Sequence, residues 1–170
     1  TNRKAQFNLL LFLSLLIAIL GSCDHQQKKQ EKAKNASADD PLEILMHGNS
    51  HFAELKPEHP DEDLNRLKEV SKDQHPIAVI VSCSDSRVSP ELIFDQGIGD
   101  LFVIRTAGNI IGNLELGSIE YAVEHLGVKL IVVLGHESCG AVQAYLKGGD
   151  APGHIKDIVD SLKEESEIQN

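Results

Sequence analysis

The sequence predicts a single α/β domain with a largely parallel central β-sheet flanked by helices. Short, β-branched apolar runs typical of buried strands alternate with segments whose apolar residues recur at helical spacing. The chain of 170 residues allows one globular domain and excludes two large ones, and a hydrophobic content of 41% is enough for a core. We assign this domain to residues 41–170.

Three helices are predicted in the first part of the domain. Asp40 before Pro41 marks a helix start, and we expect Gly48-Asn49 to interrupt that helix. The second helix covers residues 61–71, and the third covers residues 113–126. The expected buried face of the third helix consists of Leu116, Ile119, Ala122, Val123 and Leu126.

Three short apolar runs predict buried strands, at residues 77–81, 101–104 and 130–134. Two further helices are expected over residues 140–146 and 155–165. The helix at 113–126 lies between the second and third of these runs and can act as the crossover connection that parallel strands require. The order of elements therefore favours a parallel sheet.

The first 23 residues have the pattern of an export signal. Two basic residues precede an apolar run of 14 residues, Phe7 to Leu20, which is shorter than the roughly 20 residues that a membrane-spanning helix needs. The run ends in Leu20-Gly21-Ser22-Cys23, which resembles the lipobox of bacterial lipoproteins. That resemblance implies a lipid on Cys23, whereas an ordinary secretory signal or an uncleaved anchor would leave this cysteine unmodified.

Residues 24–40 contain no Val, Ile, Leu, Phe or Met and so cannot form a core. We interpret them as a polar tether between a membrane and the domain. The expected location is therefore the periplasmic side of a bacterial envelope, with the domain held there by its lipid anchor.

The charge of the chain excludes one class of partner. The net charge is −10, although residues 1–35 carry six basic and two acidic residues, so the domain itself is strongly acidic. Such a surface repels phosphate backbones, and 4% aromatic residues with no Trp offer no stacking platform, so nucleic acid is not expected as a partner. A small or neutral ligand fits this composition better.

Two cysteines and a histidine follow the ends of predicted strands. Cys83 comes after the run at 77–81, and His136 and Cys139 come after the run at 130–134. Two thiolates and one imidazole match a catalytic zinc site, which takes three protein ligands and keeps a fourth position for water. In an exported protein, however, Cys83 and Cys139 could instead form a disulfide, and these residues alone leave both interpretations open.

The neighbouring residues carry a family resemblance. Residues 82–88 (SCSDSRV) and 135–140 (GHESCG) resemble the two zinc-binding motifs of the β-class carbonic anhydrases. The resemblance covers roughly residues 41–146 and includes 102–109 (FVIRTAGN). It implies one Zn²⁺ per chain, with Cys83, His136 and Cys139 as ligands. It also implies that Asp85 and Arg87 form the catalytic pair.

Three further positions resemble the plant-type branch of this family. In that branch, residues at the positions of Gln74, Phe102 and Tyr121 line the carbon dioxide pocket. The glutamine reaches that pocket across a subunit interface, which implies a homodimer at least. Each residue alone also fits a plainer interpretation, in which Phe102 and Tyr121 are aromatic residues of the core and Gln74 is a polar residue before a strand.

The implied reaction is the reversible hydration of carbon dioxide to bicarbonate and a proton. Zinc lowers the pKa of its bound water, so that a hydroxide nucleophile exists near neutral pH. Asp85 would then orient this nucleophile and Arg87 would fix Asp85, although Asp85 could alternatively close the site as a fourth zinc ligand.

The alternative function is a non-catalytic module, stabilised by zinc or a disulfide, or an inactive truncated relative. Family members continue beyond the zinc motifs, so we expect the chain to lack a carboxyl-terminal part of the family's domain.

A second histidine pair, His47 and His51, has the spacing of a helical metal pair. Gly48 and Asn49 between them are poor helix residues, and the sequence offers no third ligand nearby. We therefore do not predict a metal site there.

Overall fold

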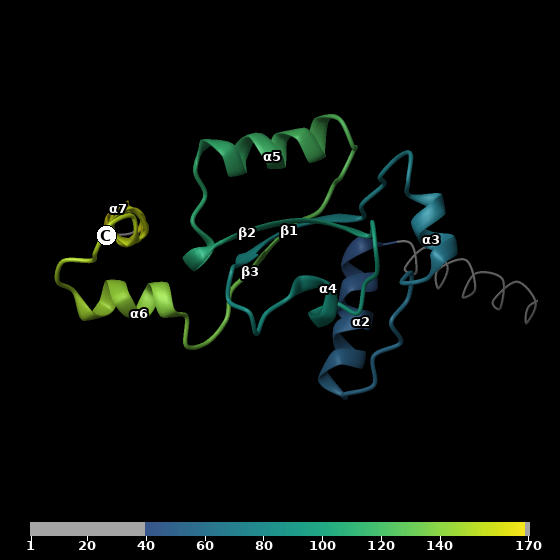
Figure 1. Ribbon diagram of the computed structural model, residues 1–170, viewed down its shortest axis with the longest axis horizontal. Helices are drawn as coiled ribbons and strands as arrows, with labels where there is room; N and C mark the ends of the chain where they lie inside the picture. The colour runs from purple at the N-terminus through teal and green to yellow at the C-terminus, as the bar shows by residue number, and fades with distance from the viewer. Residues whose placement is uncertain (1–39, 169–170) are drawn as a thin grey trace, which may run out of the picture. The chain divides into compact units, whose positions relative to one another are not determined.

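The computed structural model describes residues 40–168 (Figure 1). Nearly all of this part belongs to one compact unit, residues 44–170. The predicted signal peptide, Cys23 and the tether up to residue 39 lie outside the described residues. Within residues 40–168, no helix has both the length and the apolar character needed to cross a membrane.

A parallel sheet forms the centre of the compact unit. Within residues 40–168 it consists of β1 (Ala78–Cys83), β2 (Leu101–Thr106) and β3 (Ile131–Leu134), in the order β2-β1-β3. Both neighbours pair with β1 in parallel. This arrangement confirms the predicted α/β fold with a parallel sheet in a single domain.

Helices lie on both sides of the sheet and beyond the carboxyl ends of its strands (Figure 1). They are α2 (Pro41–Ala53), α3 (Leu64–Glu69), α4 (Pro90–Ile93), α5 (Asn113–Glu124), α6 (Gly140–Lys147) and α7 (Ile155–Ile168), with a 3₁₀ turn η1 (Ala107–Asn109). Neither α4 nor η1 was predicted from the sequence. Both are about one turn or less, which is too short to show helical periodicity.

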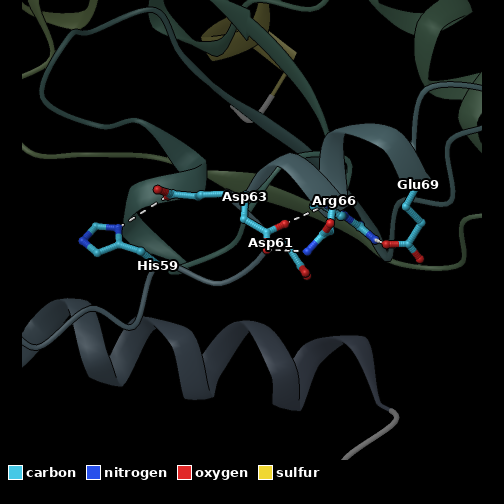
Figure 2. Close-up of a pocket in the computed structure, with 7 residues that line it drawn as sticks. His59, Asp61, Asp63, Arg66 and Glu69 are labelled. Atoms are coloured by element: carbon cyan, nitrogen blue, oxygen red, sulfur yellow. Dashed lines mark hydrogen bonds and ion pairs between the residues drawn. The ribbon is translucent and has the colours of Figure 1, made fainter.

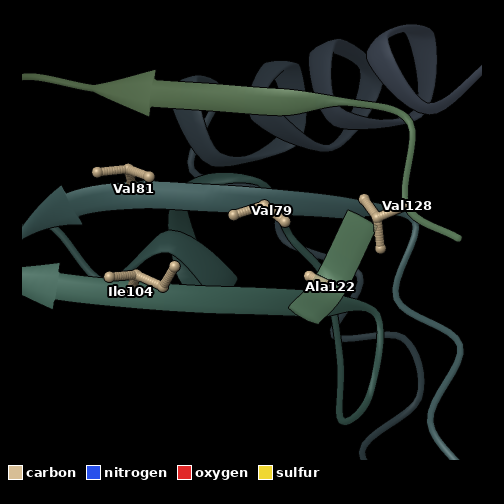
Figure 3. Packing of buried hydrophobic residues seen from close by; sticks show 5 residues of the cluster. All are labelled: Val79, Val81, Ile104, Ala122 and Val128. Atoms are coloured by element: carbon tan, nitrogen blue, oxygen red, sulfur yellow. The ribbon is translucent and has the colours of Figure 1, made fainter. Parts of the chain in front are cut away.

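All six residues of β1 are buried because each face of this strand is covered. On one face, Val79 and Val81 pack with Ile104 of β2, Ala122 of α5 and Val128 (Figure 3). On the other face, Ala78 and Ile80 form a second cluster with Leu45 of α2 and with Phe94, which follows α4. This alternation explains why the sequence of β1 is a continuous apolar run.

Helix α2 runs through Gly48-Asn49, so the predicted interruption is wrong. Gly48 is buried, and a Cβ atom at this position would lie 1.8 Å from the carbonyl oxygen of Phe94. Glycine is thus required for the close approach of α2 to the end of α4. Asn49 reinforces the contact, because its Nδ2 donates to the carbonyl of Ile93 at 3.0 Å.

Two predictions of burial are also corrected. Strands β2 and β3 are not fully buried, since only Ile104 of β2 is buried and Val133 of β3 is 70% exposed at the edge of the sheet that the described strands form. On α5, Leu116 and Val123 are exposed, whereas Ala122 is buried. The buried stripe of α5 is therefore narrower than the sequence pattern indicates.

Candidate metal centre

The fold brings Cys83, His136 and Cys139 together at the carboxyl ends of two adjacent strands. Cys83 is the last residue of β1, and Ser82 before it pairs with Leu134 at the end of β3. His136 and Cys139 lie in the turn between β3 and α6. Their candidate ligand atoms all lie within 4.8 Å of one another.

The two thiols are buried and free. Their Sγ atoms are 3.9 Å apart, so the structure contains no disulfide between Cys83 and Cys139. Of the two interpretations that the sequence left open, the geometry favours the metal site.

The ring of His136 is oriented for coordination through Nε2. Its Nδ1 lies 2.9 Å from the carbonyl oxygen of Glu137, so Nδ1–H is the donor and Nε2 keeps its lone pair. Nε2 is buried and has no hydrogen-bond partner among the described residues. An unpaired buried nitrogen beside two thiols fits a metal ion, and two sulfurs with one imidazole are a donor set typical of zinc.

The surroundings of Cys83 lower the pKa of its thiol and so favour the thiolate. Burial raises the pKa of its thiol, but the backbone N–H of Gly108 and the adjacent His136 ring outweigh burial and lower the pKa to about 7. The Gly108 N–H donates to the Cys83 Sγ at 3.4 Å. Gly108 has φ +72°, and a Cβ there would lie 2.9 Å from the Cβ of Ala141, so only glycine fits without strain.

Asp85 and Arg87 form a two-pronged ion pair next to the thiols. The Nε of Arg87 donates to Oδ1 of Asp85 at 2.8 Å, and its Nη2 donates to Oδ2 at 2.7 Å. These hydrogen bonds hold the pKa of the Asp85 carboxyl well below its usual range. The carboxylate is therefore ionised and fixed, and Nη2 of Arg87 also reaches the carbonyl of Ser138 at 3.4 Å.

Arg105 on β2 is a site residue that was not predicted from the sequence. Its Nε donates to the Cys83 carbonyl at 2.9 Å and its Nη2 to the Asp85 carbonyl at 2.6 Å. Arg105 thus anchors the segment that carries both a candidate ligand and the carboxylate. The sequence signal that could have revealed Arg105 is the presence of a charged residue within the otherwise largely apolar strand β2.

Comparisons with known proteins decide the family. Residues 78–170 match the family model described as "Carbonic anhydrase". The chain belongs to the carbonic anhydrase family. Carbonic anhydrase of Mycolicibacterium smegmatis is 52% identical over 122 residues, which are 69% of this chain and 59% of that protein. Carbonic anhydrase 2 of Mycobacterium tuberculosis is 51% identical over the same length. This chain thus spans somewhat more than half of the length of these curated relatives.

Solved structures of β-carbonic anhydrases share the fold. The β-carbonic anhydrase CcaA matches with a TM-score of 0.57 and 35% identity, covering 74% of this chain and 63% of that one. The Coccomyxa β-carbonic anhydrase, solved with acetazolamide, matches with a TM-score of 0.57 and 26% identity, covering 84% of this chain and 56% of that one. These likenesses support assignment to the β class.

The structure does not bring Gln74, Phe102 and Tyr121 to the thiols of this carbonic anhydrase chain. Phe102 pairs with Val79, whereas Cys83 pairs with Thr106 four residues further along β2. Four residues of strand span about 13 Å. Gln74 and Tyr121 line a surface hollow of about 590 Å³, and the rings of Tyr121 and Phe102 are 6.4 Å apart. Their role in a substrate pocket remains a prediction.

A hollow of about 770 Å³ near α3 contains none of the predicted site residues (Figure 2). Its main cation, Arg66, pairs with Glu69 at 3.1 Å and with Asp100 at 2.6 Å. Arg66 also donates from Nε to the Ile98 carbonyl at 2.8 Å. These contacts tie α3 to the segment before β2, which is a structural role.

Proposed function

We propose that this chain carries the zinc centre of a β-class carbonic anhydrase and catalyses the reversible hydration of carbon dioxide to bicarbonate and a proton. Cys83, His136 and Cys139 would hold one Zn²⁺. The observation that carries this proposal is the buried, unpaired Nε2 of His136 within 4.8 Å of two free thiols. Support also comes from relatives that are named carbonic anhydrase and whose sequences are 52% and 51% identical to this chain over 122 residues.

The side chains around the thiols fit this reaction. When bound, zinc lowers the pKa of a coordinated water toward neutrality. Asp85, kept ionised by Arg87, would accept a hydrogen bond from such a water and orient its lone pair toward carbon dioxide. Coordination of the metal by Asp85 itself would compete with its charge-assisted hydrogen bonds of 2.8 and 2.7 Å from Arg87, so the arrangement described favours an Asp85 that stays off the metal.

The proposal includes a homodimer. Gln74, Phe102 and Tyr121 form a cluster apart from the thiols of their own chain, so they would line a carbon dioxide pocket only for a second copy. Among the solved relatives are tetrameric β-carbonic anhydrases from Sordaria macrospora, which match with a TM-score of 0.55 and 29% identity over 82% of this chain and 64% of that one. Assembly into at least a dimer would complete each site.

We further propose that the enzyme is exported and anchored by a lipid on Cys23, on the periplasmic side of a bacterial envelope. The support is the lipobox-like sequence and the polar segment that follows it. Fractionation of cells tests this proposal: the intact chain should sediment with membranes, and a Cys23→Ser variant should not carry the lipid. A Cys23→Ser chain that carries the same lipid would contradict it.

Carbon dioxide hydration, measured by stopped flow with a pH indicator, tests the activity. The zinc-loaded 170-residue chain is compared with Cys83→Ser and with Cys23→Ser, a matched loss of a cysteine outside the site. We expect activity in the parent and in Cys23→Ser, and a loss of at least about 100-fold in Cys83→Ser. A folded, zinc-loaded parent without activity would support the non-catalytic alternative.

A further inference from the structure

Helix α2 presents two histidines on one face. His47 and His51 are one turn apart, and their ring centroids are 4.5 Å from each other. The helix is continuous from Pro41 to Ala53, so this spacing is a true helical i, i+4 pair. The continuity of the helix removes the first of the two reasons for excluding a metal site at this pair.

A third candidate ligand comes from the segment that follows the helix. Glu58 Oε1 lies 4.0 Å from His51 Nε2. The segment folds back on the helix through residues with left-handed backbone, among them Leu55 (φ 56°) and His59 (φ 52°). The second reason, that no third ligand is near, is therefore also removed.

The ring of His51 is fixed from behind by a buried carboxylate. Its Nδ1 lies 3.0 Å from Oδ2 of Asp95, which fixes the proton on Nδ1 and leaves the Nε2 lone pair toward Glu58. Asp95 is 5% exposed, and it also accepts from the backbone N–H groups of Glu58 at 2.8 Å and His59 at 3.1 Å. A carboxylate behind a histidine is the usual support of a metal-binding imidazole.

We propose that His47, His51 and Glu58 form a second metal site, separate from the thiol centre, which takes a borderline divalent transition-metal ion such as Zn²⁺. Two imidazoles and one carboxylate suit this class of ion. Neighbouring ligand atoms around tetrahedral zinc lie about 3.3 Å apart. Binding would require rotation of the Glu58 side chain, which is 72% exposed, to shorten the present 4.0 Å, and rotation of the exposed His47 ring, which now lies at 70° to the ring of His51. The ion would clamp α2 to the segment after it.

Zinc binding to the full chain tests this proposal independently of catalysis. The assay uses equilibrium dialysis with Zn²⁺ at stated free concentrations, in a background that carries both Cys83→Ser and Cys139→Ser and so lacks both sulfur ligands of the thiol centre. We expect one remaining equivalent, weakened about tenfold or more by His47→Gln and by Glu58→Gln. His47 is exposed, so its substitution leaves the fold intact.

Matched controls identify the site. Glu62→Gln removes a nearby carboxylate that faces His59, and His154→Gln removes an exposed histidine of the chain near α7. Neither should change the binding. Zinc should also raise the thermal unfolding midpoint of the background protein but not of its His47→Gln form. No remaining equivalent, or an equivalent that survives both His47→Gln and Glu58→Gln, would overturn the proposal.

Discussion

The guanidinium of Arg105 donates to the carbonyl oxygens of Cys83 at 2.9 Å and of Asp85 at 2.6 Å. One side chain of β2 thus fixes the backbone on both sides of Ser84, between the candidate zinc ligand Cys83 and the ionised Asp85. The planar group makes both contacts at once, and the single ammonium of a lysine lacks this forked geometry. Arg105 is therefore a positioning residue for the site.

Replacement of Arg105 by lysine should lower kcat/KM by about 10–100-fold, because the loop that carries Asp85 becomes less ordered. Zinc content after dialysis should remain near that of the parent, since the three candidate ligands are unchanged. Stopped-flow hydration and metal analysis measure the two effects. Unaltered kcat/KM in Arg105→Lys would show that the loop needs no such support.

Gly108 and Gly127 provide a matched pair of substitutions. Both have φ +72°, so alanine should cost roughly 1–2 kcal/mol of backbone strain at either position. Only at Gly108 does the new Cβ also meet Ala141, at 2.9 Å, and disturb the N–H contact to Cys83. Chelator competition should therefore show weaker zinc binding in Gly108→Ala and parent-like binding in Gly127→Ala. Equal zinc affinities would contradict the role of Gly108.

Gly48→Ala should destabilise the fold by about 1–3 kcal/mol, because its Cβ would overlap the Phe94 carbonyl. Gly117→Ala, in an exposed part of α5 with no described atom within 4 Å, should be neutral or stabilise the fold by up to about 1 kcal/mol. Urea unfolding at constant pH compares them. A Gly48→Ala protein as stable as Gly117→Ala would refute the close approach of α2 to α4.

A complementation experiment tests whether two copies share each site. Gln74→Ala and Cys83→Ser chains should both have low activity alone. When the chains are mixed and reassembled, the hybrid contains one site with an intact Cys83 from one chain and an intact Gln74 from the other. Activity should then rise above that of either variant. A mixture of Cys83→Ser and Cys139→Ser chains should show no such rise. Each set of three zinc ligands comes from a single chain, so every site in the hybrid would lack one of its ligands.

Much of the site could be predicted from the sequence because its signals are local. The two motifs follow apolar runs, and the carboxyl ends of parallel strands meet at one edge of a sheet, so Cys83 and Cys139 were expected to lie together. The predicted order of strands and helices was confirmed for the same reason. Periodicity within a window was enough to find the longer elements.

The errors concern contacts between distant segments. Gly48 has the local character of a helix breaker, and only the approach of Phe94, distant in sequence, explains why the helix continues. The exposure of Val133 depends on which strands lie beside β3, and the role of Arg105 depends on the register between β1 and β2. The partnership of His51 with Asp95 and Glu58 was missed because it arises from the folding back of residues 55–59.

X-ray absorption at the zinc edge tests the central claim most directly. The 170-residue chain is loaded with one equivalent of Zn²⁺ under reducing conditions, which favours the thiol centre. We predict two sulfur ligands at about 2.3 Å, one imidazole nitrogen at about 2.0 Å and a light fourth ligand, with one sulfur lost in Cys83→Ser. A shell without sulfur, in a protein whose Cys83 and Cys139 remain as free thiols, would contradict it.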